Sequence, residues 1–394
     1  MEFSFDTVID RRGTSSVKWN VAENELPMWV ADMDFPTAPP IQKALRARLE
    51  HGVFGYSTIP DAWRQAICGW WARRYRTHLE PDWLLFCSGV VPAISSVIRK
   101  LTTPGENVLL LSPVYHVFYH CIEENGRRVR ECALRYENGT YRIDFAALEA
   151  GLADPQTTLM LFCNPHNPIG AVWERETVEK IAALCKKHHV LLLSDEIHCD
   201  LTDPGVTYTP AASLPADDLG NLIVCMAPTK TFNLAGIQTS EVCVPDETLR
   251  HKVAAALHTD GVSAPNAFSV PAAVAAYTEG DAWLDALRVY LYENKQAVID
   301  YAARTIPEIR VVPAQATYLL WLDCTALTRD SRQLAADIRR LTGLFLSDGA
   351  AYGTGGECFL RMNIACPRAV LMDGLSRLAA AVRRLHHGET LTEL

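Results

Sequence analysis

The sequence predicts an α/β fold in which a large domain, built on a mostly parallel sheet, is joined to a smaller α+β domain. The chain has 394 residues, which is too many for one ordinary hydrophobic core. Uninterrupted apolar segments alternate with amphipathic ones along its middle part, as is typical of parallel strands covered by helices on both faces. This pattern changes after a long helix that we predict from about Asp281 to Arg304.

The elements of the large domain follow one another in a regular order. Asp61–Tyr75 is predicted to be a helix because its apolar residues recur at helical spacing after Pro60. Further helices are predicted from Pro92 to about Leu101 and over Arg175–His188. Apolar segments bounded by turn signals are predicted to be strands: Trp83–Cys87, Asn107–Ser112, Arg128–Leu134, Thr158–Cys163, Val190–Ser194, Asn221–Met226 and Ser240–Val244.

The smaller domain is predicted from the last quarter of the chain. Strand-like and helical segments alternate there: Ile309–Val312, Tyr318–Leu322, Ser331–Leu341, Phe359–Ile364 and Pro367–His386. We expect the large domain to comprise residues 47–285, and the N-terminal segment 1–46 to complete the small domain with residues 286–394.

Composition excludes several classes of function. The formal net charge of −9 argues against binding to a nucleic-acid backbone. The polar stretch Met1–Asn20 has no secretory pattern, and no apolar run is long enough to cross a bilayer. The twelve cysteines lack paired spacing, so we expect thiols in a reducing compartment, with four of them in strand cores: Cys87, Cys163, Cys225 and Cys243. A cytoplasmic enzyme acting on a small molecule is the expectation.

Three polar motifs follow predicted strands, at the sheet edge where α/β proteins bind ligands. In the first, Asn164–Gly170, two prolines and a glycine form a rigid loop that presents Asn167. The same residues would also make an ordinary turn.

The second motif, Ser194–His198, places Asp195 at the end of a buried strand. A carboxylate there needs a charged partner, and a protonated pyridine nitrogen is one candidate. A metal ion held by Asp195, Glu196 and His198 is the alternative. Neighbouring strand residues point to opposite sides of a sheet, so we favour a cofactor and predict no metal site.

The third motif, Ala227–Asn233, places Lys230 between a buried strand and apolar residues. Lysines are most often on the surface. Burial would lower the pKa of this amine and make it available for imine chemistry.

Together, these motifs and others in the same order resemble the fold-type-I pyridoxal-phosphate enzymes of the aminotransferase superfamily. More narrowly, the chain is similar to the MalY/PatB group of cystathionine β-lyases (C–S lyases). The resemblance covers nearly the whole chain, and it implies the aspartate aminotransferase-like fold with a seven-stranded sheet. The motifs that carry it are Leu26–Phe35, Phe54–Tyr56, Ser88–Pro92, Pro113–Tyr115, Asn164–Gly170, Ser194–His198, Lys230 and Phe359–Asn363.

The resemblance implies a role for each matching residue around the cofactor ring. Lys230 would form the Schiff base with pyridoxal 5'-phosphate and later move the Cα proton. Asp195 would pair with the pyridine nitrogen. Asn167 and His198 would bind the phenolic oxygen, and Tyr115 would stack on the ring as a further catalytic residue.

The resemblance also implies how the phosphate is bound. Ser88, Gly89 and Val90 would bind it at the start of a helix, together with Thr229. Tyr56 would reach the phosphate of a neighbouring subunit, which implies a homodimer with shared active sites.

The substrate, an amino acid, would be bound chiefly through its carboxylate. Arg361 suits this role because a guanidinium group binds a carboxylate through two hydrogen bonds. Ala31, Asp32 and Asn167 would complete the substrate site.

Some positions depart from the pattern of the superfamily. Ala227 and Gln238 replace a serine and an arginine that commonly bind the phosphate, and Ala316 and Cys358 stand where glycine is expected. The glycine-rich stretch Tyr352–Gly356 is interpreted as a flexible loop near Arg361 rather than a nucleotide-binding loop.

The expected reaction is β-elimination, in which L-cystathionine or another cysteine S-conjugate yields a thiol, pyruvate and ammonia. An aminotransferase would use the same residues and is the first alternative. A regulatory protein that binds the cofactor and acts through a protein partner is a second, less favoured one.

Overall fold

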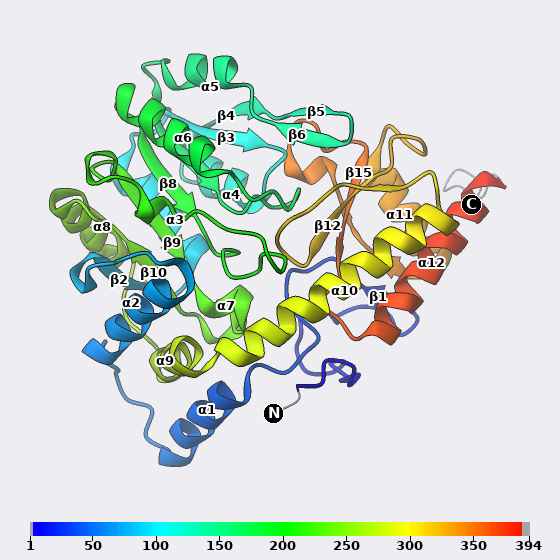
Figure 1. Ribbon diagram of the computed structural model, residues 1–394, viewed down its shortest axis with the longest axis horizontal. Helices are drawn as coiled ribbons and strands as arrows, with labels where there is room; N and C mark the ends of the chain where they lie inside the picture. Colours follow the sequence, from blue (N-terminus) through cyan, green and yellow to red (C-terminus); the bar gives the residue numbers. More distant parts are fainter. Residues whose placement is uncertain (1–2, 388–394) are drawn as a thin grey trace.

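The computed structural model describes residues 3–387 and contains two main sheets (Figure 1). The larger sheet has seven strands, which lie in the order β2-β10-β9-β8-β7-β3-β4. Their bounds are β2 Leu84–Cys87, β3 Asn107–Ser112, β4 Arg128–Ala133, β7 Thr157–Cys163, β8 Leu191–Asp195, β9 Leu222–Met226 and β10 Ser240–Cys243. β10 runs antiparallel to both of its neighbours, and the remaining pairs are parallel. The predicted mostly parallel, seven-stranded sheet is therefore confirmed.

Helices cover both faces of this sheet. Successive residues of a strand point to opposite sides, so the apolar strands present buried side chains on both faces. In β7, Leu159 and Leu161 join one core cluster, whereas Met160 and Phe162 join the other. The helices are α1 Pro39–His51, α2 Asp61–Tyr75, α3 Val90–Leu101, α4 Val117–Glu123, α5 Phe145–Leu152, α6 Arg175–Lys187, α7 Pro228–Thr231, α8 Glu247–Thr259 and α9 Ser269–Glu279.

The long helix α10, Asp281–Thr305, runs from the large sheet to the smaller one (Figure 1). The smaller sheet is antiparallel and is packed against two helices. Its elements are β11 Arg310–Val311, β12 Leu319–Asp323, β14 Ser347–Asp348 and β15 Phe359–Asn363, with α11 Ser331–Thr342 and α12 Arg368–His386. The N-terminal strand β1, Leu26–Pro27, pairs with β13, Leu344–Phe345. The division into two domains at residues 46/47 and 285/286 stays a prediction.

Most predicted elements are present, with shifts of one or two residues at their ends. α3 begins at Val90 rather than at Pro92. The hairpin of β5, Arg135–Glu137, and β6, Thr140–Arg142, was not predicted as strands. Asn138 and Gly139 form its turn, with φ values of 53° and 83°. The four strand cysteines are buried, as predicted.

Buried carboxyl groups lie in hydrogen-bonded pairs with tyrosines: Glu196 with Tyr208, Asp200 with Tyr75, and Glu241 with Tyr277. Glu241 is fully buried, and its second carboxyl oxygen has no hydrogen-bond partner within residues 3–387. Burial raises the pKa of Glu241 to about 8. This carboxyl group therefore favours its neutral form in the folded protein.

Replacing Glu241 by glutamine should make folding less sensitive to alkaline pH. The pKa of Glu241 is raised in the folded state, so the stability contributed by its protonated form is fully present below about pH 4.5. This contribution is lost as the pH rises from there through about 8. The free energy of unfolding of the parent protein should therefore fall by about 4 kcal/mol relative to Glu241→Gln between pH 5 and pH 9. Urea unfolding at several pH values measures this difference, with the exposed Glu279→Gln as a matched control. Parallel pH profiles of the parent and Glu241→Gln would contradict the prediction.

Candidate active site

A cavity of about 270 Å³ lies at the carboxyl ends of the central strands. The segments that follow β2, β3, β7, β8 and β9 all contribute to it, as expected for an α/β sheet. The predicted site residues among its lining are Ala31, Ser88, Gly89, Val90, Tyr115, Asn167, Asp195, His198, Thr229 and Lys230.

Lys230 lies on the short helix α7, directly after β9, and is partly exposed toward the cavity. Its amine donates a hydrogen bond of 2.6 Å to the carbonyl oxygen of Ala31. Desolvation, together with the positive charge of Arg361, lowers the pKa of Lys230 to about 8. A substantial fraction of this amine is therefore neutral, and hence nucleophilic, near neutral pH.

Asp195 ends β8 and faces the same cavity, with 5% of its surface exposed. Burial raises the pKa of Asp195 to about 7, because only the backbone N–H of Ile197 and the charge of Lys230 favour the ionised form. The neighbouring Glu196 is bonded to Ser194, Tyr208 and the backbone N–H of Ala211 instead. The two carboxyl groups thus have separate partners, as the alternation of strand residues predicts.

Arg361 projects from β15 of the smaller sheet and is 97% buried, with 3% of its surface exposed. Its guanidinium group donates to Asn167 Oδ1 at 3.2 Å and to the carbonyl oxygen of Trp29 at 2.8 Å. Its Nε has no hydrogen-bond partner within residues 3–387. A buried donor of this kind leaves Arg361 able to bind a carboxylate.

Residues Trp29–Asp34 form a segment, called the strap below, that reaches the cavity through Ala31. Five successive strap carbonyls accept hydrogen bonds from distant side chains. Arg361 and Ser347 donate to Trp29, and Asn363 donates to both Val30 and Asp32. Lys230 and Tyr318 donate to Ala31, and Arg11 and Asn233 donate to Met33. The strap is therefore hydrogen-bonded to both predicted cationic site residues, Lys230 and Arg361, and through them it connects the two sheets.

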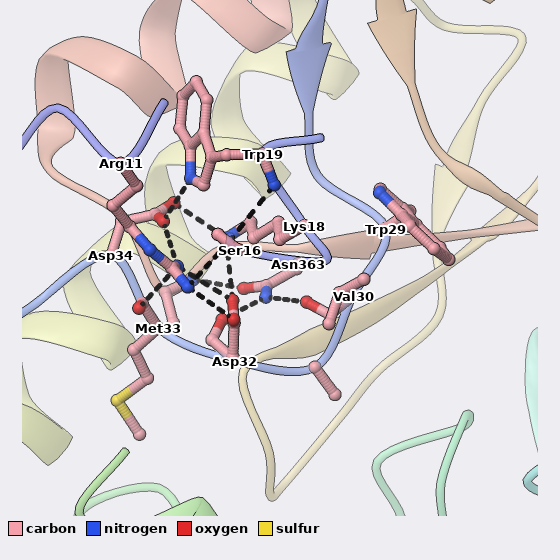
Figure 2. A network of polar contacts seen from close by, with 12 residues as sticks. Arg11, Ser16, Lys18, Trp19, Trp29, Val30, Asp32, Met33, Asp34 and Asn363 are labelled. Atoms are coloured by element: carbon pink, nitrogen blue, oxygen red, sulfur yellow. Dashed lines mark hydrogen bonds and ion pairs between the residues drawn. The ribbon is translucent and has the colours of Figure 1, made fainter. Parts of the chain in front are cut away.

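The far end of the strap is held by a network of charges (Figure 2). Asp34 accepts hydrogen bonds from Arg11 and Lys18, each at 2.7 Å, and from the indole of Trp19 at 2.8 Å. Arg11 also pairs with Asp32 at 2.7 Å. Two cations thus balance two buried or half-buried carboxylates, so none of the four charges is left uncompensated.

The start of α3 offers an anion site in the same cavity. Gly89 precedes the helix, and no side chain caps its free N–H groups. The hydroxyl-bearing residues Ser88 and Thr229 line the cavity beside it, as does Gln238. Ala316 and Cys358, where glycine was expected, do not line the cavity.

The remaining predicted residues lie as follows. Tyr115 lines the cavity, and burial raises its pKa to about 12. His198 is buried, its pKa is lowered to about 3 by desolvation, and its Nδ1 has no partner in the described part of the chain. The side chain of Asp32 faces Arg11 and not the cavity lining. Tyr56 is fully exposed, at the rim of a separate cavity.

Sequence reasoning missed Tyr318 and Asn233. Tyr318 is buried and shares the Ala31 carbonyl with Lys230, whereas Asn233 bonds the backbone of Met33 and Phe35. Asn233 ends the predicted motif Ala227–Asn233 and Tyr318 begins a predicted strand, but only the fold brings their side chains to the strap. The Tyr352–Gly356 loop lies near Arg361, as predicted, since the guanidinium carbon is 5.0 Å from the Tyr352 ring centre.

These residues fit pyridoxal phosphate. The site combines a lysine of lowered pKa, a facing carboxyl group and an anion-binding helix start. It also contains buried nitrogens of Arg361 and His198 that have no hydrogen-bond partner in the described part of the chain. Residues 20–378 match the model of the family described as aminotransferase class I and II. The chain belongs to this family.

Relatives of this aminotransferase-family protein match it over nearly its whole length. Cystathionine beta-lyase PatB of Bacillus subtilis is 41% identical, over 96% of this chain and 100% of PatB. Protein MalY of Escherichia coli is 35% identical, over 97% of this chain and 99% of MalY. The crystal structure of cystalysin from Treponema denticola, which contains pyridoxal 5'-phosphate, has a TM-score of 0.94 at 32% identity and covers 98% of this chain and 100% of cystalysin.

Between residues 3 and 387, no helix is both long and apolar enough to span a membrane. The same residues contain no group of three or more histidine, cysteine, aspartate or glutamate side chains arranged to hold a metal ion.

Proposed function

We propose that this protein is a pyridoxal-phosphate-dependent C–S lyase that cleaves L-cystathionine or a related cysteine S-conjugate by β-elimination. The observation that carries the proposal is the 41% identity to a protein named cystathionine beta-lyase, over 96% of this chain and 100% of that protein. The cavity supports it, because Lys230 and Asp195 line it, and Arg361 donates a hydrogen bond of 3.2 Å to Asn167, which also lines it. Water completes the reaction, and the products are a thiol, pyruvate and ammonia.

Bound pyridoxal phosphate supplies an electron sink that stabilises negative charge at the substrate Cα. Asp195 lines the cavity and would keep a proton on the ring nitrogen of the cofactor. Tyr115 offers an aromatic wall, Asn167 and His198 offer hydrogen bonds to the phenolic oxygen, and the start of α3 would bind the phosphate.

The chain's own side chains then orient the substrate and move its proton. Arg361 binds the substrate carboxylate, using the Nε that no other described residue contacts by a hydrogen bond. This contact fixes the Cα–H bond near Lys230. The amine of Lys230, whose pKa is lowered to about 8, accepts the Cα proton and releases its hydrogen bond to Ala31. Loss of the thiolate from Cβ follows.

We further propose that the active form is a homodimer. Tyr56 is fully exposed, and its neighbours Val53 and Phe54 are 65% and 52% exposed. Such an apolar, exposed segment suits contact with a second subunit. There, Tyr56 would reach the partner's phosphate site. The free cysteines support a reducing location, and we propose the cytoplasm.

A single assay tests the proposed reaction. Purified protein loaded with pyridoxal phosphate is incubated with L-cystathionine in the absence of any keto acid. We expect equimolar pyruvate, ammonia and homocysteine. Product formation that requires an added keto acid would instead identify an aminotransferase, since the residues of the cavity serve both reactions.

A further inference from the structure

A second cavity, of about 570 Å³, lies outside the active site and is lined mainly by charged side chains. Three elements form it: the end of α2, the segment after β8, and α10. We call it the arginine pocket because four of its lining residues are Arg73, Arg74, Arg76 and Arg288. The formal net charge of the whole chain is −9, so this concentration of cations is a local feature.

Three of the four guanidinium groups are held in place by the protein itself. Those of Arg73 and Arg74 lie 5.5 and 5.3 Å from the ring centre of Trp70. Arg288 is fixed from α10 by hydrogen bonds of 2.8 and 2.9 Å to the carbonyl oxygen and hydroxyl of Thr202. Fixed groups lose little conformational entropy when they bind a ligand.

Carboxylates compensate only part of this positive charge. Asp285 is 56% exposed and pairs with Arg74 at 2.8 Å and with Arg288 at 3.8 Å. The other lining carboxyl group, Asp200, is buried and accepts hydrogen bonds from the side chains of Trp70, Tyr75 and Thr231. Burial also raises the pKa of Asp200. Asp281, just outside the cavity lining, pairs with Arg73 at 2.9 Å and with Arg74 at 3.6 Å. Among the described residues, two partly exposed carboxylates, Asp281 and Asp285, thus compensate four guanidinium groups.

Arg76 is the least compensated of the four. Its guanidinium has no ion pair or hydrogen bond to any residue between 3 and 387, and it stands just after α2, with φ 52°. The carbonyl end of α2 favours cations and accounts for arginines in its last turn. It does not account for Arg288, which approaches the same cavity from another helix.

We propose that the arginine pocket binds a small polyanion, a compound that carries at least two phosphate or carboxylate groups. Guanidinium groups bind both kinds of oxyanion through paired hydrogen bonds. The hydroxyl groups of Thr202 and Thr207 line the same cavity and can donate further hydrogen bonds. The site is separate from the active site, since none of its lining residues lines the cavity that contains Lys230.

Isothermal titration of the cofactor-loaded protein tests this proposal, with pyrophosphate and citrate as separate probes. We expect saturable binding of one molecule per chain, weakened by added salt. Arg76→Gln should weaken binding about tenfold, and Arg73→Gln combined with Arg76→Gln should weaken it further. Because Arg76 has no partner to lose, the fold of the single variant is not at risk. The exposed Arg46→Gln on α1 is the matched control and should bind as the parent does.

The two probes separate the possible ligands. Tighter binding of pyrophosphate would assign the pocket to a phosphate compound, and tighter binding of citrate to a polycarboxylate. The proposal is overturned if neither probe binds saturably, or if Arg76→Gln and the double variant bind as tightly as the parent. Neither result depends on whether the protein cleaves cystathionine.

Discussion

Replacement of Lys230 by alanine is expected to reduce pyruvate formation from L-cystathionine by at least about 10³-fold, because no other amine of residues 3–387 lines the cavity to accept the Cα proton. The folded structure should change little, since the amine donates to one acceptor, the Ala31 carbonyl, which also accepts a bond from Tyr318. Steady-state pyruvate release measures the effect, and thermal unfolding checks the fold. The absorbance band of the lysine-bound cofactor should disappear as well.

Two controls make the Lys230 result specific. Lys252→Ala removes an exposed lysine of α8 and should leave turnover unchanged. Methylamine added to Lys230→Ala should restore part of the lost activity, because a small amine can occupy the vacated space and accept the proton. Full pyruvate release by Lys230→Ala would rule out the role proposed for this residue.

The second large effect is expected for Asp195→Asn, with a fall in kcat of about 10²- to 10³-fold. Asparagine keeps the shape of aspartate but cannot hold a proton at the ring nitrogen by charge, and an unpaired buried charge costs about 3–5 kcal/mol. KM should change less than kcat, because Arg361 binds the substrate carboxylate independently of Asp195. Stopped-flow and steady-state kinetics measure the two parameters.

The matched control for Asp195 is its neighbour. Glu196→Gln also neutralises a buried carboxyl group, but Glu196 is bonded to Ser194, Tyr208 and Ala211 and does not line the cavity. Its kcat should stay near that of the parent. Equal losses in Asp195→Asn and Glu196→Gln would show that general destabilisation, rather than a charge at the cofactor, causes the effect.

The central strands could be predicted from the sequence because their signals are local. The predicted strand Asn107–Ser112 coincides with β3, since an apolar run stands there between two turn signals. The helix α9 was missed because Ser269–Glu279 is apolar on nearly all sides and packs against both α1 and α2, so it shows no helical periodicity. The reversed direction of β10 was not predictable either, because no local pattern specifies it.

The candidate reactive residues of the site could also be predicted from the sequence. Lys230, Asp195 and Asn167 each follow a strand in a recognisable motif, and the fold brings them to one cavity. The side chains that hold the strap at this cavity could not be predicted in the same way. The strap carbonyls have donors such as Asn233 and Asn363, and nothing near either residue in the sequence indicates which backbone it will contact.

The order in which the chain is synthesised gives the strap a further consequence. Its carbonyls at Trp29 and Val30 bond to side chains 332 and 333 positions later, and β1 pairs with β13. While the chain is still emerging from the ribosome, this segment has none of these partners, and contacts of such long range form slowly. The cofactor pocket cannot be completed until Asn363 has been made. The strap, although it is translated long before its partners, is therefore among the last parts of the enzyme to reach its working position.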